Sequence, residues 1–206
     1  MTNWLQDLHY TFRQLRKSPG FTIAAVLTLA VAIGANPVVF AALNGLVWRP
    51  LNVPHAESLF DVGRVESTGD ESYPNYLDLR DRNHSVDALA ASAFAHDGLD
   101  TGDGAEGAWG FATSGNYFDV LGVQPYLGRV FHASDEHGPN SAPYIVLSYA
   151  YWQSHFHDNR NVLGRTVLLS KHPLTIIGVA QPGFLGTFIE FSPAFFVPIV
   201  ITAEVN

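Results

Sequence analysis

The chain has 206 residues, no cysteine and a formal net charge of −8 at pH 7. This length suits one domain of ordinary size, or a smaller domain with an appended segment, and the missing cysteines exclude disulfides, thiolate zinc sites and thiol nucleophiles. Residues 1–20 hold three basic residues and one acidic residue, whereas residues 49–206 hold 8 basic and 18 acidic residues. The acidic character of residues 49–206 argues against nucleic acid as a partner, because phosphate binding needs a basic surface.

The first predicted element is an amphipathic helix over residues 1–18. At helical pitch, an arc of about 100° holds five apolar side chains, namely Trp4, Leu5, Leu8, Phe12 and Leu15. Three cations lie outside this arc, namely Arg13, Arg16 and Lys17. Such a helix either lies on the lipid bilayer with its cations toward phosphate or packs on a protein partner, and both interpretations remain open.

The second predicted element is an uncharged apolar run over residues 19–48. A bilayer core about 30 Å thick needs roughly 20 helical residues to cross it, so we predict a transmembrane helix. A buried core helix is disfavoured because such helices usually carry a polar stripe. A cleaved secretion signal is the stronger alternative, because Phe21–Ile33 has the length of a signal core and Gly34 and Ala35 are small. The signal interpretation is weakened by the long N-terminal arm. It is also weakened by Ile33, a large residue at the position before the cleavage site where a small one is needed.

The flanks of the run predict its orientation. Three cations precede it and only Arg49 follows it closely, so the positive-inside tendency places the N-terminus in the cytoplasm. Pro37 removes a backbone donor inside the run, which predicts a kink or a contact with a partner helix. Ala30 and Gly34, four residues apart, would allow another helix to approach, although this spacing is a weak signal.

Residues 50–206 predict a mixed α+β domain. Alternating or short apolar runs predict strands at 58–66, 88–97, 107–114, 144–148, 165–170, 174–180 and 195–199. Helices are predicted at 73–83, with Pro74 in its first turn, and at 149–156. Between them a short helix begins after Asn116, which can cap it, and ends at Gly122 with positive φ.

The glycine- and aspartate-rich stretch between the second and third strands predicts an exposed hairpin loop. Asp97, Asp100 and Asp103 invite a calcium interpretation, but they are spaced by three. A calcium loop of the EF-hand type needs acidic residues at alternate positions, so a hairpin tip is the better interpretation.

The sequence predicts no catalytic, cofactor-binding or metal-binding residues. Neither Lys17 nor Lys171 follows the glycine pattern of a phosphate-binding loop. ATP hydrolysis through such a loop is therefore excluded. His155 and His157 fall in a predicted helix, where they point about 200° apart and cannot share an ion. A second group is interpreted as solvated loop residues, namely His132, Asp135, Glu136 and His137.

Several ordered segments carry a family resemblance. They are "SGNYFDVLGVQPYLGRVF" (114–131), "VLSYAYWQSHF" (146–156), "NVLGRTVLLS" (161–170), "LTIIGVAQPGFLGT" (174–187) and "FFVPI" (195–199). In this order they resemble the periplasmic core domain of MacB-type ABC transporter permeases. Residues 7–51 are similar to the start of the duplicated orphan permeases of that group. The resemblance therefore assigns residues 50–206 to such a periplasmic core domain.

The resemblance implies a permease component of the bacterial inner membrane with its main domain in the periplasm. It implies no catalysis and no cofactor of its own, because ATP would bind only to a separate ABC ATPase subunit. Other expected partners are the bilayer and another permease chain or three further membrane helices, which do not occur before Asn206. The sequence thus resembles the N-terminal portion of a permease. A single-span extracytoplasmic binding module without transport activity is the alternative.

Overall fold

The computed structural model describes residues 13, 15–46, 51–62, 72–138, 141–188 and 191–201. The chain divides into two units, residues 1–49 and residues 50–206. Most of the predicted amphipathic helix over residues 1–18 lies outside the described residues, because residues 1–12 and 14 are not described. The last residues of the predicted span, 47 and 48, also lie outside them.

The first unit contains helix α2, Pro19–Leu46, which continues without interruption through Pro37. Its Pro19–Ala41 portion, 23 residues, is long and apolar enough to cross a membrane, and none of it is buried. The Thr28 hydroxyl donates to the Ala24 carbonyl (2.8 Å), and the Thr22 hydroxyl lies 2.7 Å from the Leu15 carbonyl and 3.0 Å from the Ser18 carbonyl, so both hydroxyls have partners within this unit. Length, composition and exposure all fit a helix surrounded by lipid.

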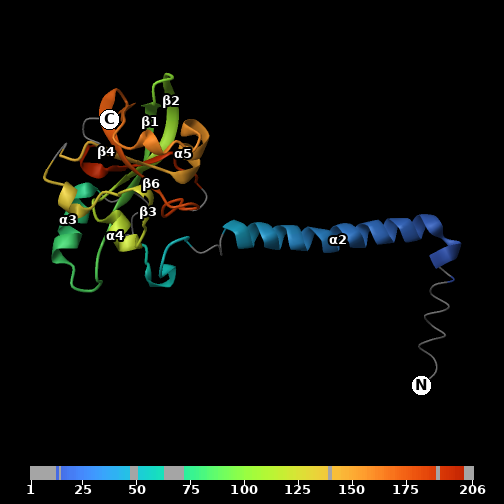
Figure 1. The fold of residues 1–206 in the computed structure, drawn as a ribbon. Coiled ribbons are helices and arrows are strands. Elements are labelled where there is room, and N and C mark those ends of the chain that lie inside the picture. Colours follow the sequence, from blue (N-terminus) through green and yellow to red (C-terminus); the bar gives the residue numbers. More distant parts are fainter. Residues whose placement is uncertain are drawn as a thin grey trace. The chain divides into compact units, whose positions relative to one another are not determined.

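The second unit is built on one seven-stranded sheet (Figure 1). Its strands are β1 (Ser92–Asp100), β2 (Ala105–Thr113), β3 (Pro125–Gly128), β4 (Tyr144–Leu147), β5 (Thr166–Leu169), β6 (His172–Ala180) and β7 (Phe195–Pro198). Its helices are α3 (Tyr73–Arg82), α4 (Tyr117–Leu121) and α5 (Tyr149–Phe156). Single 3-10 turns occur at Ala56–Ser58, Ala133–Asp135, Arg160–Val162 and Ile199–Ile201. The predicted α+β class is confirmed.

The strand pairings close the sheet on itself. The order is β3-β6-β4-β7-β2-β1-β5, and β5 also pairs with β6. β4 runs parallel to β6 along one edge, while β5 and β3 pair antiparallel with the two ends of the other edge. Strand β7 lies between β2, to which it is parallel, and β4, to which it is antiparallel. Six strands therefore form a ring, and β3 pairs with the part of the β6 edge that lies beyond β5.

Both faces of the central strand β7 are buried, which explains its fully apolar sequence. Phe195 and Val197 of β7 belong to one cluster, together with Trp152 of α5. Phe196, between them, belongs to a second cluster that contains Phe118 of α4. Successive side chains point to opposite faces of a strand, so β7 contributes to both clusters.

Local signals position the two helices that cover the sheet. The Ser148 hydroxyl accepts a hydrogen bond from the Tyr151 amide (3.1 Å) and caps α5. Trp152 and Phe156 of this helix, four residues apart, are both buried. Helix α4 ends at Gly122 in the left-handed conformation (φ 65°), which confirms the prediction for this glycine.

Two predictions of local structure are wrong. The predicted strand 58–66 does not form in its described part, because a 3-10 turn ends at Ser58 and residues 59–62 are irregular. Phe60 is 80% exposed there, so the alternation has no buried face to satisfy; residues 63–66 lie outside the described part. Asn116 makes no capping hydrogen bond to α4, because its side chain bonds to Ser114 and Leu89 instead.

Candidate functional site

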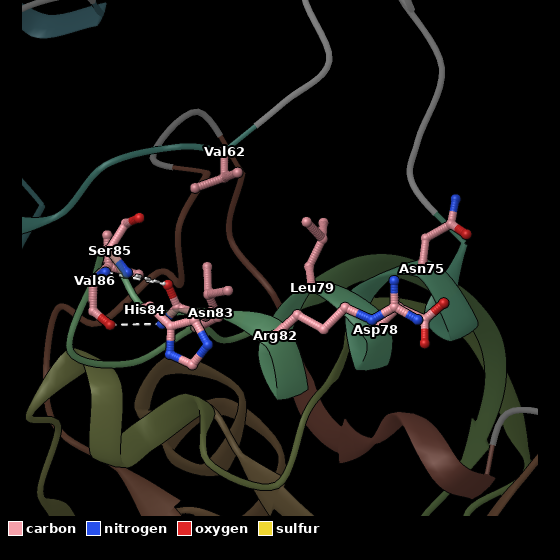
Figure 2. A pocket seen from close by; sticks show the side chains of 10 residues that line it. Val62, Asn75, Asp78, Leu79, Arg82, Asn83, His84, Ser85 and Val86 are labelled. Carbon is pink, nitrogen blue, oxygen red and sulfur yellow. Dashed lines mark hydrogen bonds between the residues drawn. The ribbon is translucent and has the colours of Figure 1, made fainter.

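An open groove runs along α3 in the described part of the domain. It has a volume of about 570 Å³. Its walls are formed by Val62, Asn75, Asp78, Leu79, Arg82, Asn83, His84, Ser85, Val86 and Leu89. Figure 2 shows Leu79 extending from α3 on the side where Val62 lies. Leu79 of α3 is 49% exposed and Val86, in the segment after it, is 43% exposed, so the groove presents apolar side chains to the solvent.

A hydrogen-bond network fixes α3 to the rest of the domain. The Tyr76 hydroxyl donates to Asn116 (3.2 Å) and lies 3.3 Å from the Leu89 carbonyl. The Asn116 amide donates to the same carbonyl (2.7 Å), and the Ser114 hydroxyl donates to the Asn116 side-chain oxygen (2.8 Å). The groove is therefore a firm surface, because its far wall is tied to the sheet through buried polar groups.

The groove lacks an arrangement suited to chemistry. The Asn83 side chain is used within its own turn, where it donates to the Val86 carbonyl (2.6 Å) and accepts from the Ser85 and Val86 amides (Figure 2). Asp78, Arg82 and His84 line the open side. An open, mixed apolar and charged surface of this kind fits contact with another molecule better than an enclosed reaction.

The structure separates the two histidines of the H-x-H pair. The ring of His155 stacks on Tyr151 (3.9 Å between centroids), and its Nε2 lies 2.8 Å from the Glu106 carboxylate. His157 ends the helix in the left-handed conformation (φ 48°). Among the described residues no three His, Asp or Glu side chains gather closely enough to hold a metal ion.

The second predicted group, His132, Asp135, Glu136 and His137, lies around a 3-10 turn. Arg129 donates to both oxygens of Asp135 (2.7 and 3.0 Å), and the His132 amide donates to one of them (2.9 Å). Burial alone would raise the pKa of Asp135, but these hydrogen bonds bring it below its ordinary value. The His132 ring contacts Asp119 of α4 (2.8 Å). The group thus holds a turn in place.

Glu136 is the unusual member of this group. Its Oε1 atom is buried and has no hydrogen-bond partner among the described residues. Burial is the largest influence on its pKa, which is raised above the ordinary value although the Gly115 amide and Arg80 act in the opposite direction. A Cβ atom on Gly115 would lie 2.8 Å from the carboxyl carbon, so glycine is needed there to admit this side chain.

The three aspartates of the predicted loop lie on a hairpin, as expected. β1 and β2 pair antiparallel from Ser92–Thr113 to Asp100–Ala105. The Asp100 carboxylate accepts hydrogen bonds from the amides of Gly102 (2.8 Å) and Gly104 (3.2 Å), and Asp97 accepts one from Ser170 (2.9 Å). These carboxylates are used to shape the turn and to attach β1 to the end of β5.

The comparisons with known proteins agree with this geometry. The family model of the MacB-like periplasmic core domain matches residues 22–205. The chain belongs to this family. The resemblance noted in the sequence is therefore confirmed over nearly the whole chain.

One solved structure shares the fold. The periplasmic region of MacB from Actinobacillus actinomycetemcomitans is similar with a TM-score of 0.52 and 21% identity, over 64% of this chain and 56% of that one. The chain thus spans about half the length of that region. The extracellular domain of the noncanonic ABC-type transporter YknZ from Gram-positive bacteria matches with a TM-score of 0.41 and 19% identity, over 53% of each chain.

A third structure is a domain of a putative permease protein from Porphyromonas gingivalis. It matches with a TM-score of 0.40 and 13% identity, over 57% of this chain and 49% of that one. No curated protein matches the chain.

The groove along α3 was not anticipated from the sequence. The helix itself was predicted correctly, but the exposed side chains of Leu79, on the helix, and Val86, after it, were not recognised as a surface feature. The only sequence signal was the presence of leucine and valine within an otherwise polar stretch, 75–86. Such a signal identifies a groove only once the packing of the neighbouring segments is known.

Proposed function

We propose that this chain is a membrane-embedded permease component of an ABC-type export or mechanotransmission system. A family match over residues 22–205 supports this role, because it covers a helix fit to cross a membrane together with the domain that follows it. In this proposal residues 1–18 lie at the inner surface of the bacterial inner membrane and residues 19–48 span it. Residues 50–206 lie in the periplasm.

The domain would act by contact rather than by catalysis. Its ring of strands is filled with apolar side chains on both faces, so it can transmit a displacement with little internal deformation. Its open groove offers a surface on which another part of the machinery can rest. The energy would come from a separate ABC ATPase, and ATP would be bound only there.

Association with a nucleotide-binding subunit tests this proposal. Membranes that contain the tagged chain are solubilised in mild detergent, and the chain is recovered together with its partners. We expect an ABC ATPase in the recovered complex, in an amount that matches a full-length permease treated in parallel. If the full-length permease retains its ATPase and this chain does not, the transport role is wrong.

A single-span binding module is the second candidate. One membrane-fit helix and the domain that follows it, as the described residues show, would suffice for such a module. The same experiment separates the two functions. A module without transport activity would be recovered with extracytoplasmic proteins and without any ATPase.

A further inference from the structure

One face of the β1–β2 hairpin exposes aromatic side chains. The strand register places Phe94 opposite Phe111 and His96 opposite Trp109 on this face. Phe94 is 50% exposed and Trp109 is 47% exposed, whereas Phe111 is fully buried. The face therefore changes from buried to open along the hairpin, which projects from the domain in Figure 1.

These aromatic side chains are held in place by one another. The rings of His96 and Trp109 lie 4.2 Å apart between centroids. Phe191 meets both Phe94 and Trp109 edge-on at 5.5 Å, and Phe188 lies 4.6 Å from Phe94. Side chains that are already fixed lose little conformational entropy when a partner binds them, which favours their use as anchors.

Beyond the aromatic pair the same face is flat. Gly98 and Gly107 are the next cross-strand pair, and they leave bare backbone between Trp109 and the turn. Neither of the two hollows described in the domain is lined by residues of this hairpin. A flat face without a cavity suits a protein segment rather than a small molecule, because small ligands need concave sites.

The charge of the hairpin indicates the chemistry of the partner. Residues 83–128 contain no lysine and no arginine. Within them the hairpin, 92–113, carries four carboxylates. Asp100 lies on the face of Phe94 and Trp109 and Asp103 lies in the turn, whereas the register places Asp97 and Glu106 on the opposite face. Asp103 lies exposed at the turn. A partner that carries positive charge would therefore meet complementary charge at the tip and an electron-rich indole face beside it.

We propose that this face of the hairpin, made by Phe94, His96, Trp109 and the two glycines, binds a basic segment of a partner protein. An arginine or lysine of that segment stacks on Trp109, and its backbone lies over the glycines. A neighbouring basic side chain pairs with Asp103. The inference goes beyond the permease role and does not depend on coupling to an ATPase.

Fluorine NMR of the full chain in a zwitterionic detergent tests this inference directly. Its four tryptophans are labelled with 5-fluorotryptophan, and the Trp109 signal is assigned with Trp109→Phe. The probe is an octapeptide of alternating arginine and glycine. We expect it to shift the Trp109 signal in a saturable way and to leave buried Trp152 unchanged. Its glutamate–glycine counterpart should have no effect, and equal shifts with both peptides would overturn the inference.

Variants locate the site. The affinity of the fluorescent arginine–glycine peptide is measured by anisotropy. Trp109→Ser is expected to weaken binding about tenfold, as for an aromatic anchor, whereas Tyr126→Ser, which removes a tyrosine 41% exposed on β3, should not. Asp103→Lys should weaken binding by about fivefold, and Asp87→Lys should leave it unchanged. If the two lysine variants bind equally, the hairpin is not the site, and this comparison remains valid even where Trp109→Ser fails to fold.

Discussion

Two glycines of β2 lie three residues apart and differ in what surrounds them. A Cβ atom on Gly110 would lie 2.5 Å from the ring and the carbonyl oxygen of Phe195, on the neighbouring strand. A Cβ atom on Gly107 would meet only the His96 ring, at 3.5 Å. The first position is therefore required by the approach of β7, and the second leaves room for a side chain.

Gly110→Ala is expected to lower the free energy of unfolding by about 1–3 kcal/mol, because the new methyl group forces β2 and β7 apart. Gly107→Ala is the matched control in the same strand, and its effect should stay within about 0.5 kcal/mol. Thermal unfolding of the full chain in detergent, followed by near-ultraviolet circular dichroism, measures both. Equal losses would show that β2 and β7 are not packed this closely.

Asp135 predicts a dependence of stability on pH. Its pKa is lower in the folded domain than its ordinary value of 3.8, so its ionised form stabilises the fold. This contribution is complete above the pKa of the unfolded chain and disappears as the pH falls through the lower, folded value. Asp135→Asn should therefore destabilise the domain at pH 7 and change its stability much less near pH 2.

The measurement is urea unfolding of both proteins at the two pH values. Asp81→Asn serves as the control, because Asp81 pairs with Arg80 at a more exposed position (side chain 64% exposed, against 18% for Asp135). A difference between wild type and Asp135→Asn that is the same at both pH values would contradict the assigned role of this carboxylate.

At the scale of elements, α3 and α5 both begin with a serine cap of unequal strength. The Ser148 hydroxyl is buried and accepts from the Tyr151 amide at 3.1 Å. The Ser72 hydroxyl is exposed and accepts from the Asn75 amide at 3.4 Å. Water can replace the second hydrogen bond but not the first, because a buried donor without a partner keeps its full desolvation cost.

Ser148→Ala is accordingly expected to destabilise the domain by about 1–2 kcal/mol, and Ser72→Ala by about 0.5 kcal/mol or less. Chemical denaturation of the two variants beside the wild type gives both values. Ser148→Thr, which keeps the hydroxyl, should recover most of the loss. Equal effects of the two alanine variants would mean that burial does not decide the strength of these caps.

The elements that could be predicted from the sequence are those with local signals. Helix 149–156 agrees with the prediction to the residue, because Ser148 marks its start and a buried Trp152 marks its face. The segment after Ala56 shows the limit, since its alternation resembles a strand but finds no neighbouring strand in its described part. Ring closure through β5 and β6 could not be foreseen either, because pairing between strands far apart in the chain leaves no local pattern.

The candidate surfaces were harder to predict for a related reason. The aspartates were correctly placed on a hairpin, but sequence alone does not show that Phe94 and Trp109 share one face with two glycines. That knowledge requires the register of β1 against β2. A slip of one residue would move the side chains of one strand to the other face of the sheet. The groove along α3 likewise depends on how segment 83–89 packs beside the helix.

At the scale of the whole molecule, the two units should behave differently toward a membrane. A chain that spans the bilayer through α2 stays in the pellet when membranes are extracted with alkaline carbonate. Ile23→Arg combined with Leu29→Arg should release a large part of the chain, because charges inside the span are costly. Asp87→Arg combined with Asp103→Arg, in the domain, should not. Release of the wild-type chain would show that α2 does not span.

The position of β7 has a consequence for how the domain is made. A chain that emerges from its N-terminus first completes β2 and β4 well before residues 195–198, yet these two strands meet only through β7. Until Phe195 arrives, both strands keep an open edge, and open edges pair readily with other chains. The domain therefore stays vulnerable to aggregation from the completion of β2 until residues 195–198 are made, and the arrival of β7 ends this exposure.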